Sequence, residues 1–361
     1  MTTLAAWLHD LNPIIFRISG DFAIRWYGFA YVAGFVVGWL LLRALAVRGV
    51  VRIPPRFALD AVVIASMGVV LGGRLGYVII YNPSLLITFE PAFPFWGVLD
   101  VIHGGMASHG GMIGVGIAAI LIARGFKTET GERIGACPRL HVLDALALTA
   151  TPGLLFGRIA NFVNGELLGK VVAGMGEPGP WWAVKFPQEA TQRWDELTDV
   201  QQAAYARMTS LSTETSLIYR SEDVTRIFEK NYEGILTKLQ QGSVEAAKML
   251  EPVVSARHPS QLYQALCEGI ILGGALLLIW ARPRKPGVIV ACFMMIYGVL
   301  RIVTEFWRLP DAGSARTLGL STGQWLSALL FAGGLAFLMF ALKRKSEPLG
   351  GWMPKSQPEA R

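Results

Sequence analysis

The sequence predicts an all-α polytopic membrane protein with about seven transmembrane helices and a small extracytoplasmic domain inserted between helices 4 and 5. Seven apolar runs each approach the roughly 20 residues that a helix needs to cross the hydrocarbon layer. Only 16% of the 361 residues are charged, whereas soluble domains carry about 25%. Lysine and arginine also gather in alternate short connections, as is typical of multi-pass membrane proteins.

The apolar runs set the expected boundaries. We predict helices at about 24–46, 58–81, 104–123, 142–163, 260–281, 287–306 and 322–342. The chain then divides into an N-terminal segment with helices 1–4, an insert, helices 5–7 and a tail, over residues 1–163, 164–258, 259–342 and 343–361. Leu4, Trp7 and Leu8 suggest an interfacial amphipathic helix in the first ten or so residues. The tail is expected to be disordered after Lys345.

The charge of the short connections predicts the orientation. Basic residues fill the first, third and fifth connections and the start of the tail, at 43–56, 124–139, 282–285 and 343–345. The second connection has none, and the sixth holds only Arg308 and Arg316. Because short basic loops stay in the cytoplasm, we expect a periplasmic N-terminus and a cytoplasmic C-terminus.

The fourth connection, about 164–258, is the exception in length. It is polar, with Trp181, Trp182 and Trp194 near its start and a charged, helix-like middle. Long external domains do not follow the charge rule, so its basic residues agree with the same orientation.

Composition also excludes some functions. A formal net charge of +7 would suggest a nucleic-acid partner if the basic residues formed a soluble face, but they lie between apolar runs. The cysteines Cys137, Cys267 and Cys292 lack metal-ligand spacing and a disulfide framework. No nucleotide-binding loop is visible. We therefore expect no nucleic acid, no metal and no cofactor.

Unusual polar residues converge at one predicted membrane depth, near the outer ends of five spans. They are Arg25, Trp26, Tyr27, Arg74, His103, His109, Arg158, Asn161, Arg301 and Glu305. Scattered snorkelling would populate both faces of the membrane. The convergence indicates a site open to the outer leaflet.

Structural interpretations compete with functional ones here. The paired glycines around His109 permit close helix packing with a hydrogen-bonded histidine. They also permit a broken helix that lines a cavity, where the histidine acts as a proton acceptor or as a donor to a bound ester. Arg25-Trp26-Tyr27 is either an interfacial anchor or a wall of a lipid pocket.

The same choice applies to the other charges. Tyr297, Arg301 and Glu305 repeat every four residues, so they share a helix face that either fixes packing or presents a cation. Two arginines at one depth favour an anionic ligand, because a guanidinium binds phosphate in a bidentate fork. Arg74 is either a third cation or the partner of an acid. Glu268 needs a partner that the sequence does not identify.

The most specific stretch covers residues 157–169, which read G-R-I-A-N-F-V-N-G-E-L-L-G. Arg158 and Asn161 share a helix face, while Asn164 points elsewhere. Gly165 is expected to end the helix, which leaves Glu166 just beyond it to accept hydrogen bonds.

The spacing G-R-x-A-N-F-x-N-x-E-x-x-G resembles the signature of the prolipoprotein diacylglyceryl transferases. Further matching stretches are Arg25-Trp26-Tyr27-Gly28, the two His-Gly-Gly segments within 103–111, His258-Pro259-Ser260-Gln261-Leu262-Tyr263 and Tyr297-Gly298 through Phe306. The resemblance covers about 20–310 outside the insert, whose stretch 170–257 looks longer than usual.

The resemblance implies an enzyme of the bacterial inner membrane with seven helices and a periplasm-facing site. It implies transfer of the diacylglyceryl group of phosphatidylglycerol to the lipobox cysteine of a preprolipoprotein signal peptide, the first step of lipoprotein maturation. The implied catalytic residues are His109, Arg158 and Arg301. The implied headgroup-binding and positioning residues are Tyr27, Asn161, Glu166, Gly169, Tyr297 and Glu305. His103 occupies a variable position, so His109 is the favoured base.

Two other classes compete. A transporter or flippase for anionic lipid would use the same arginines, but it predicts polar residues through the whole membrane depth and often internal symmetry. Neither is visible in the sequence. A non-catalytic scaffold would leave the thirteen-residue polar motif without a purpose.

Overall fold

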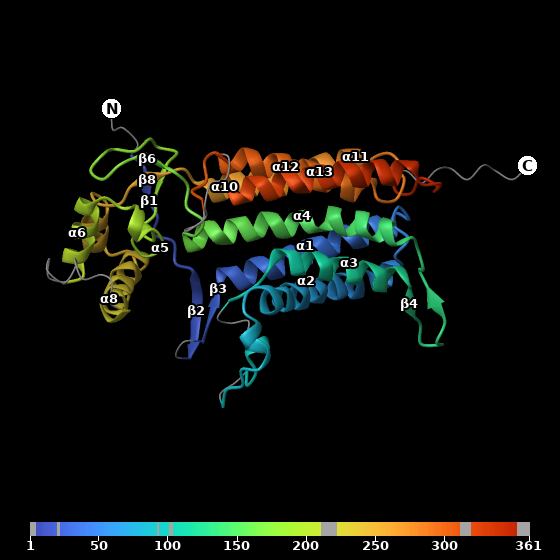
Figure 1. Cartoon of the computed structure of the whole chain (residues 1–361), viewed down its shortest axis with the longest axis horizontal. Coiled ribbons are helices and arrows are strands. Elements are labelled where there is room, and N and C mark those ends of the chain that lie inside the picture. The colour runs from blue at the N-terminus through green and yellow to red at the C-terminus, as the bar shows by residue number, and fades with distance from the viewer. Residues whose placement is uncertain are drawn as a thin grey trace, which may run out of the picture. The chain divides into compact units, whose positions relative to one another are not determined.

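The computed structural model of the chain describes residues 5–19, 22–91, 94–100, 104–210, 222–310 and 319–351. The described chain is mainly helical (Figure 1). It divides into two compact units. The first unit comprises Met1–Val32, Leu154–Gly269 and Gly298–Leu329, and the second comprises Ala33–Gly153, Ile270–Tyr297 and Leu330–Arg361.

Among the described residues, six helical spans are long and apolar enough to cross a membrane, which confirms the predicted class. They are α1 (Trp26–Val47), α2 (Ala58–Ile80), α4 (Arg139–Asn164), the run Ser260–Trp280, α12 (Val288–Glu305) and α13 (Thr322–Lys343). Large apolar side chains on these helices are exposed, Val32 at 58% for example. Such exposure suits helices whose outer faces contact lipid.

The span Ser260–Trp280 is a composite. It consists of α10 (Ser260–Gln264), a π-helical turn (Ala265–Ile271) and α11 (Leu272–Trp280). A π-turn inserts a residue into the helix and is frequent at functional sites. Glu268 lies within it and is fully buried.

Helix α3 (Ser108–Ala123) is shorter than the predicted span 104–123. Its 16 residues extend about 24 Å, against the roughly 30 Å of a hydrocarbon core. The prediction of its start was wrong because Gly104 and Gly105 have φ values of +89° and +81°, which a right-handed helix excludes.

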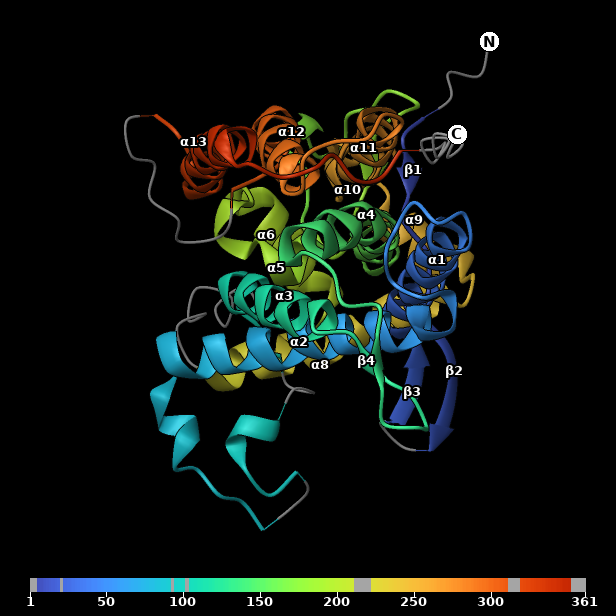
Figure 2. The ribbon, with the colours of Figure 1, turned by 90° about the vertical axis from the view of Figure 1, so that its right-hand side faces the viewer.

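Glycines bring α2 and α3 into close contact within the second unit, and both views show the two helices side by side (Figures 1 and 2). A Cβ added at Gly110 would lie 2.1 Å from the carbonyl oxygen of Gly72, and one at Gly114 would lie 1.8 Å from that of Gly68. The backbones can approach so closely only because neither helix carries side chains there. Close packing is therefore confirmed at Gly110, whereas Gly104 and Gly105 break the helix.

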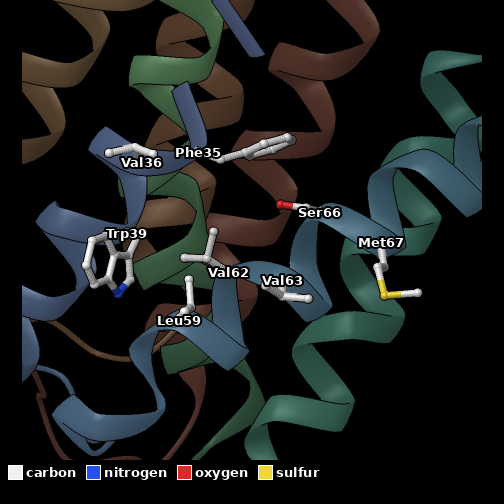
Figure 3. A pocket seen from close by; sticks show the side chains of 8 residues that line it. All are labelled: Phe35, Val36, Trp39, Leu59, Val62, Val63, Ser66 and Met67. Atoms are coloured by element: carbon white, nitrogen blue, oxygen red, sulfur yellow. The ribbon is translucent and has the colours of Figure 1, made fainter. Parts of the chain in front are cut away.

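An apolar groove runs between α1 and α2 in the same unit (Figure 3). Its lining includes Phe35, Trp39, Leu59 and Met67, and Ser66 brings a hydroxyl. A groove with this lining suits lipid chains and contains no charged group for chemistry.

The predicted insert folds in the first unit around a small sheet with strand order β1–β7–β8–β6. Strands β6 (Val171–Ala173), β7 (Val184–Lys185) and β8 (Ala256–Arg257) are antiparallel neighbours, and β1 (Trp7–Leu8) pairs in parallel with β7. The expectation of an amphipathic helix over the first residues was therefore wrong for Trp7 and Leu8, because β7 offers them a strand edge. Leu4 lies outside the described residues.

The same unit also contains helices. They are α5 (Glu189–Gln192), α6 (Asp199–Met208), α8 (Glu222–Gln240) and α9 (Val244–Leu250). Their apolar faces form a core that includes Tyr205, Phe228, Tyr232 and Leu250. Thr198 and Gln201 form a reciprocal cap at the start of α6, which satisfies free N–H groups of its first turn.

Two hairpins complete the described strands. Strands β2 (Ile14–Ser19) and β3 (Phe22–Arg25) precede α1, and β4 (Phe126–Lys127) and β5 (Arg133–Ile134) follow α3. These short elements leave the helical class unchanged.

The tail after Lys345 is ordered as far as Gly351. Arg284 and Leu349 exchange backbone hydrogen bonds of 2.9 and 2.8 Å, so the tail adds a short bridge to the connection before α12. The expectation of disorder was wrong for this part, and residues 352–361 lie outside the described residues. Asp144 has a structural role, since it accepts the N–H groups of Gly287 and Val290 at 2.7 and 2.9 Å.

Candidate active site

Helix α4 ends at Asn164, where the sequence predicts. Gly165 has a φ of +64°, a left-handed conformation that glycine adopts without steric cost, and its N–H donates to the Phe162 carbonyl at 3.0 Å. Glu166 follows directly, and its N–H donates to the Asn161 carbonyl at 2.9 Å. This turn brings Glu166 back beside the last turn of the helix.

The Glu166 carboxylate is held on both oxygens. Asn161 Nδ2 donates to Oε2 at 2.9 Å, and Asn164 Nδ2 donates to Oε1 at 3.1 Å. The prediction that Glu166 accepts hydrogen bonds is confirmed. Asn164 joins the same network, although helix geometry alone directs it away from Arg158. Two amide donors fix the orientation of the carboxylate, so Glu166 is pre-organised to accept a hydroxyl of a ligand.

The start of α10 holds the backbone after Glu166. Leu167 has a φ of +54°, which is uncommon for a branched side chain. Ser260 Oγ donates to the Leu167 carbonyl at 2.9 Å, and the Gln261 side-chain amide donates to the Glu166 carbonyl. The stretch 258–263 therefore starts a helix, as expected, and also fixes the loop that carries Glu166.

Gly169 lies where three backbone segments meet. A Cβ there would lie 2.1 Å from the His258 carbonyl oxygen, so only glycine fits. The N–H of Lys170 donates to the Trp307 carbonyl at 2.9 Å, and Arg257 Nη1 donates to the Gly169 carbonyl at 3.2 Å. This junction ties the end of the insert to the end of α12. It gives Gly169 a packing role, while direct headgroup contact stays a prediction.

Arg158 on α4 pairs with Glu268 in the π-turn. Arg158 Nε donates to Glu268 Oε2 at 2.9 Å, and the side chains are 19% and 0% exposed. Glu268 is thus the carboxylate that fixes the plane of the Arg158 guanidinium. The sequence shows that Glu268 needs a partner but not which one, because 110 residues separate the pair.

Arg301 on α12 has a carboxylate partner one turn away. Arg301 Nη1 lies 2.8 Å from Glu305 Oε2, although the approach is not aligned as a hydrogen bond. Glu305 also accepts Ser321 Oγ at 3.2 Å and Arg308 Nη1 at 3.4 Å. The shared helix face predicted for Arg301 and Glu305 is confirmed by this contact. Arg308 and Ser321 were missed, because nothing in their local spacing sets them apart.

Tyr27, at the start of α1, belongs to the same unit. Its ring centroid lies 5.1 Å from that of Tyr31. Tyr31 in turn is close enough to Arg158 and Glu166 to interact with them electrostatically. The tyrosine pair therefore lies near the end of α4, and its role as an interfacial anchor or as a wall of the site stays a prediction.

His109 and Tyr297 belong to the second unit. His109 is the second residue of α3 and is exposed, and no described residue hydrogen-bonds to its ring. Tyr297 stacks on Phe293 with ring centroids 5.8 Å apart, one helical turn before Arg301. Their catalytic and positioning roles stay predictions. His103 lies outside the described residues.

Arg74, in the second unit, serves neither of the roles considered for it. Its guanidinium donates to the carbonyls of Gly97 at 2.6 Å, Val98 at 2.8 Å, Gly104 at 2.6 Å and Gly105 at 3.0 Å. The side chain is buried, so it acts as a hub that organises backbone rather than as a cation facing a ligand. It holds the two left-handed glycines that precede α3 and His109.

His258 is a further titratable group in the first unit. Its ring stacks on Trp182 with centroids 5.1 Å apart, and its Nδ1 lies 3.3 Å from the Tyr263 hydroxyl. Burial, and then the nearby Lys170, lower the pKa of His258, so the ring is neutral at pH 7. A neutral imidazole can accept a proton, which makes His258 a second candidate base beside His109.

Comparison with known proteins decides between the functional classes. The chain matches the family model described as prolipoprotein diacylglyceryl transferase over residues 13–340. This chain belongs to the prolipoprotein diacylglyceryl transferase family. The resemblance drawn from its motifs is therefore confirmed.

Individual relatives agree with the family match. A phosphatidylglycerol–prolipoprotein diacylglyceryl transferase of Bdellovibrio bacteriovorus is 38% identical over 354 residues, which cover 96% of this chain and 97% of the relative. Relatives with the same name from Rhodospirillum rubrum and Neisseria gonorrhoeae are 32% and 33% identical. They cover 94% and 93% of this chain and 94% and 98% of their own lengths.

Membership of the prolipoprotein diacylglyceryl transferase family, together with the apolar helices, makes this chain a multi-pass transferase of the bacterial inner membrane. Within the described ranges, no group of three histidine, cysteine, aspartate or glutamate residues is placed to hold a metal ion.

Proposed function

We propose that this chain transfers the diacylglyceryl group of phosphatidylglycerol to the thiol of the lipobox cysteine of a preprolipoprotein. The thiolate sulfur attacks the carbon of the diacylglyceryl group that is bonded to the phosphate oxygen, and that carbon–oxygen bond breaks. A thioether forms, and glycerol 1-phosphate leaves with the bonding electron pair. This is the first step of bacterial lipoprotein maturation.

The observation that carries the proposal is the pairing of each site arginine with a carboxylate inside one unit of a membrane protein. Arg158 is set by Glu268 and Arg301 by Glu305, at 2.9 and 2.8 Å. A guanidinium stays charged in a low-dielectric setting and matches phosphate geometry. A carboxylate that fixes its plane lowers the reorganisation needed when charge grows on the departing phosphate.

The neighbouring groups fit the rest of the headgroup. Glycerol hydroxyls are hydrogen-bond donors, and the Glu166 carboxylate, fixed by Asn161, is an acceptor that already has its orientation. Tyr27 would bound the headgroup from the start of α1, and Tyr297 is assigned to the headgroup by the family motif alone. Gly169 supports this role indirectly, because its packing holds the loop that follows Glu166.

The thiol must lose its proton to become a good nucleophile. His109 is the base that the family motif favours, and its ring is exposed at the start of α3. Nearby arginines also lower a thiol pKa by stabilising the thiolate, which would make a histidine base dispensable. The proton ends either on the histidine or on the glycerol phosphate.

The proposed orientation puts the N-terminus and the site on the periplasmic side and the C-terminus in the cytoplasm. It is supported by the basic first, third and fifth connections. Spans that alternate in direction bring the start of α1, the ends of α4 and α12 and the start of α10 to the same side. These four helix ends all belong to the first unit. Phosphatidylglycerol would then enter from the outer leaflet.

The test is diacylglyceryl transfer from phosphatidylglycerol to a lipobox peptide in detergent, with release of glycerol phosphate as the readout. Arg158→Lys keeps the charge but removes the fork, so we expect a loss of roughly 100-fold or more in kcat. Arg226→Lys, an exposed site on α8, is the matched control and should leave transfer unchanged. A wild-type protein that binds phosphatidylglycerol but releases no glycerol phosphate would favour a lipid transporter instead.

A further inference from the structure

A cavity of about 710 Å³ opens among the basic connections of the second unit. Three arginines line it, from three separate parts of the chain. Arg52 lies in the connection between α1 and α2, Arg139 begins α4, and Arg344 follows α13. All three lie in connections that the charge pattern places on the same side of the membrane.

Apolar groups line the same cavity. Leu140, Phe340 and Leu349 are among them, and Phe340 is 52% exposed at the end of α13. The Arg344 guanidinium carbon lies 5.7 Å from the centroid of the Phe340 ring. Cationic and apolar surfaces therefore meet at the ends of membrane-spanning helices, where lipid headgroups join acyl chains.

The cavity has an ordered wall made by the tail. Besides the bridge between Arg284 and Leu349, Lys285 Nζ donates to the carbonyls of Leu342 and Arg344 at 2.6 and 3.0 Å. Arg52 is anchored too, since its backbone N–H donates to His141 Nε2 at 3.3 Å. The backbones that carry two of the arginines are therefore held in place.

The charges of this cavity favour an anion. Within the described residues, no carboxylate lies within ion-pair distance of the three guanidinium groups. Glu347 is the one carboxylate in the lining, against three arginines. Ser346 Oγ is buried in the lining without a hydrogen-bond partner, which costs free energy that a phosphate oxygen would recover.

We propose that this cavity binds an anionic phospholipid from the leaflet that faces the basic connections. The arginines hold the phosphate in charge-assisted hydrogen bonds, and an acyl chain follows the apolar side past Phe340. A free phosphate would make the polar contacts alone, so the apolar lining points to the lipid. The site is separate from the proposed transfer site, because its lining contains none of the predicted site residues.

Cys137 provides a local reporter, because it lines the cavity and is half-buried. Replacing Cys267 and Cys292 with alanine leaves Cys137 as the single thiol. The protein is placed in phosphatidylcholine nanodiscs with or without phosphatidic acid, and alkylation by a water-soluble maleimide is timed. At ten times its Kd, phosphatidic acid should slow the alkylation about tenfold, since it leaves about one site in eleven open.

The comparison uses the ratio of rates with and without phosphatidic acid for each variant. Burial raises the pKa of the Cys137 thiol and Arg52 opposes the rise, so absolute rates will change when Arg52 is replaced. Arg52→Gln with Arg344→Gln should abolish the protection. Arg48→Gln, exposed in the same connection but outside the lining, should keep it. If the double variant fails to fold, each single variant should show weakened protection.

Two further arms separate the lipid from other causes. Inorganic phosphate at equal concentration should give no protection. A reporter at the exposed Thr130→Cys, with Cys137→Ala, measures the surface potential of the charged membrane alone and should be slowed less. Equal protection by inorganic phosphate, equal slowing at Thr130→Cys, or loss of protection in Arg48→Gln would each overturn the proposal.

Discussion

Glu268→Gln tests whether a carboxylate is needed to orient the site arginine. The substitution keeps the size of the side chain and one acceptor oxygen, and it removes the charge. Glu268 is fully buried, and its carboxylate contacts Arg158 Nε at 2.9 Å, so the change acts chiefly on that contact.

The magnitude follows from this geometry. At 2.9 Å and an effective dielectric constant of about 20, the gross attraction is roughly 6 kcal/mol, which desolvation of the two groups largely offsets. Removing one partner of a buried ion pair lowers the free energy of unfolding by roughly 3–5 kcal/mol. Because Arg158 is partly exposed, we expect a loss at the low end of this range. A guanidinium displaced by about 1 Å lowers kcat by roughly 100-fold.

The assay is diacylglyceryl transfer in detergent, with kcat and KM for phosphatidylglycerol measured separately and Tm measured in parallel. We expect kcat to fall roughly 10- to 100-fold, by the positioning argument above, while the protein stays folded at the assay temperature. Glu268→Asp should retain part of the rate, because it keeps the charge.

The opposite result would refute this reasoning. If Glu268 competes with the phosphate for Arg158, Glu268→Gln will lower KM and leave kcat equal to or above the wild-type value. The carboxylate would then be an inhibitor of binding that the site must displace, and the assignment of Glu268 as an orienting residue would be wrong.

Three further expectations concern Gly169, the two candidate bases and His9. Gly169→Ala should lower the free energy of unfolding by roughly 1–3 kcal/mol, because its Cβ would lie 2.1 Å from the His258 carbonyl oxygen. Thermal melts check this, with Gly234→Ala, in open space on α8, expected to be neutral or stabilising. Profiles of kcat against pH for His109→Gln and His258→Gln identify the base. The variant that lacks the base should lose the acidic limb of the profile. If both variants keep that limb, the arginines are the groups that generate the thiolate. Burial lowers the pKa of His9, whose Nε2 contacts the Phe162 carbonyl at 2.8 Å. The neutral form of His9 therefore stabilises the fold above the pKa of the unfolded chain, near 6.5. This stabilisation is lost as the pH falls below that value. Tm should therefore drop between pH 7 and 5, and less in His9→Gln; an equal drop in both proteins would contradict the assignment.

Local features of the chain were predictable from the sequence because they depend on neighbours within a few residues. Membrane-spanning length depends on an unbroken apolar run, and six of the seven predicted spans lie within a few residues of their expected bounds. The end of α4 at Gly165 and the hydrogen-bonded Glu166 follow from one turn of helix. The family motif is equally local, so membership of the family could be inferred from the order of the residues alone.

The errors lie where distant segments decide the local conformation. Helix α3 begins at Ser108 rather than at 104 because Arg74 holds Gly104 and Gly105 in left-handed conformations. Trp7 and Leu8 form a strand because β7 offers them an edge. The tail is ordered because Leu349 pairs with Arg284. None of these partners can be read from hydrophobic periodicity.

The order of the residues was enough to infer the membrane class, the spans, the family and the residue types that the proposed chemistry needs. The folded chain was needed to show that Glu268 pairs with Arg158, that Ser260 holds the Leu167 carbonyl, and that Arg74 binds backbone rather than a ligand. The physical reason is the range of the interactions. Hydrophobic length and helix caps act along the chain, whereas a buried charge or carbonyl takes whichever partner the fold brings within about 3 Å.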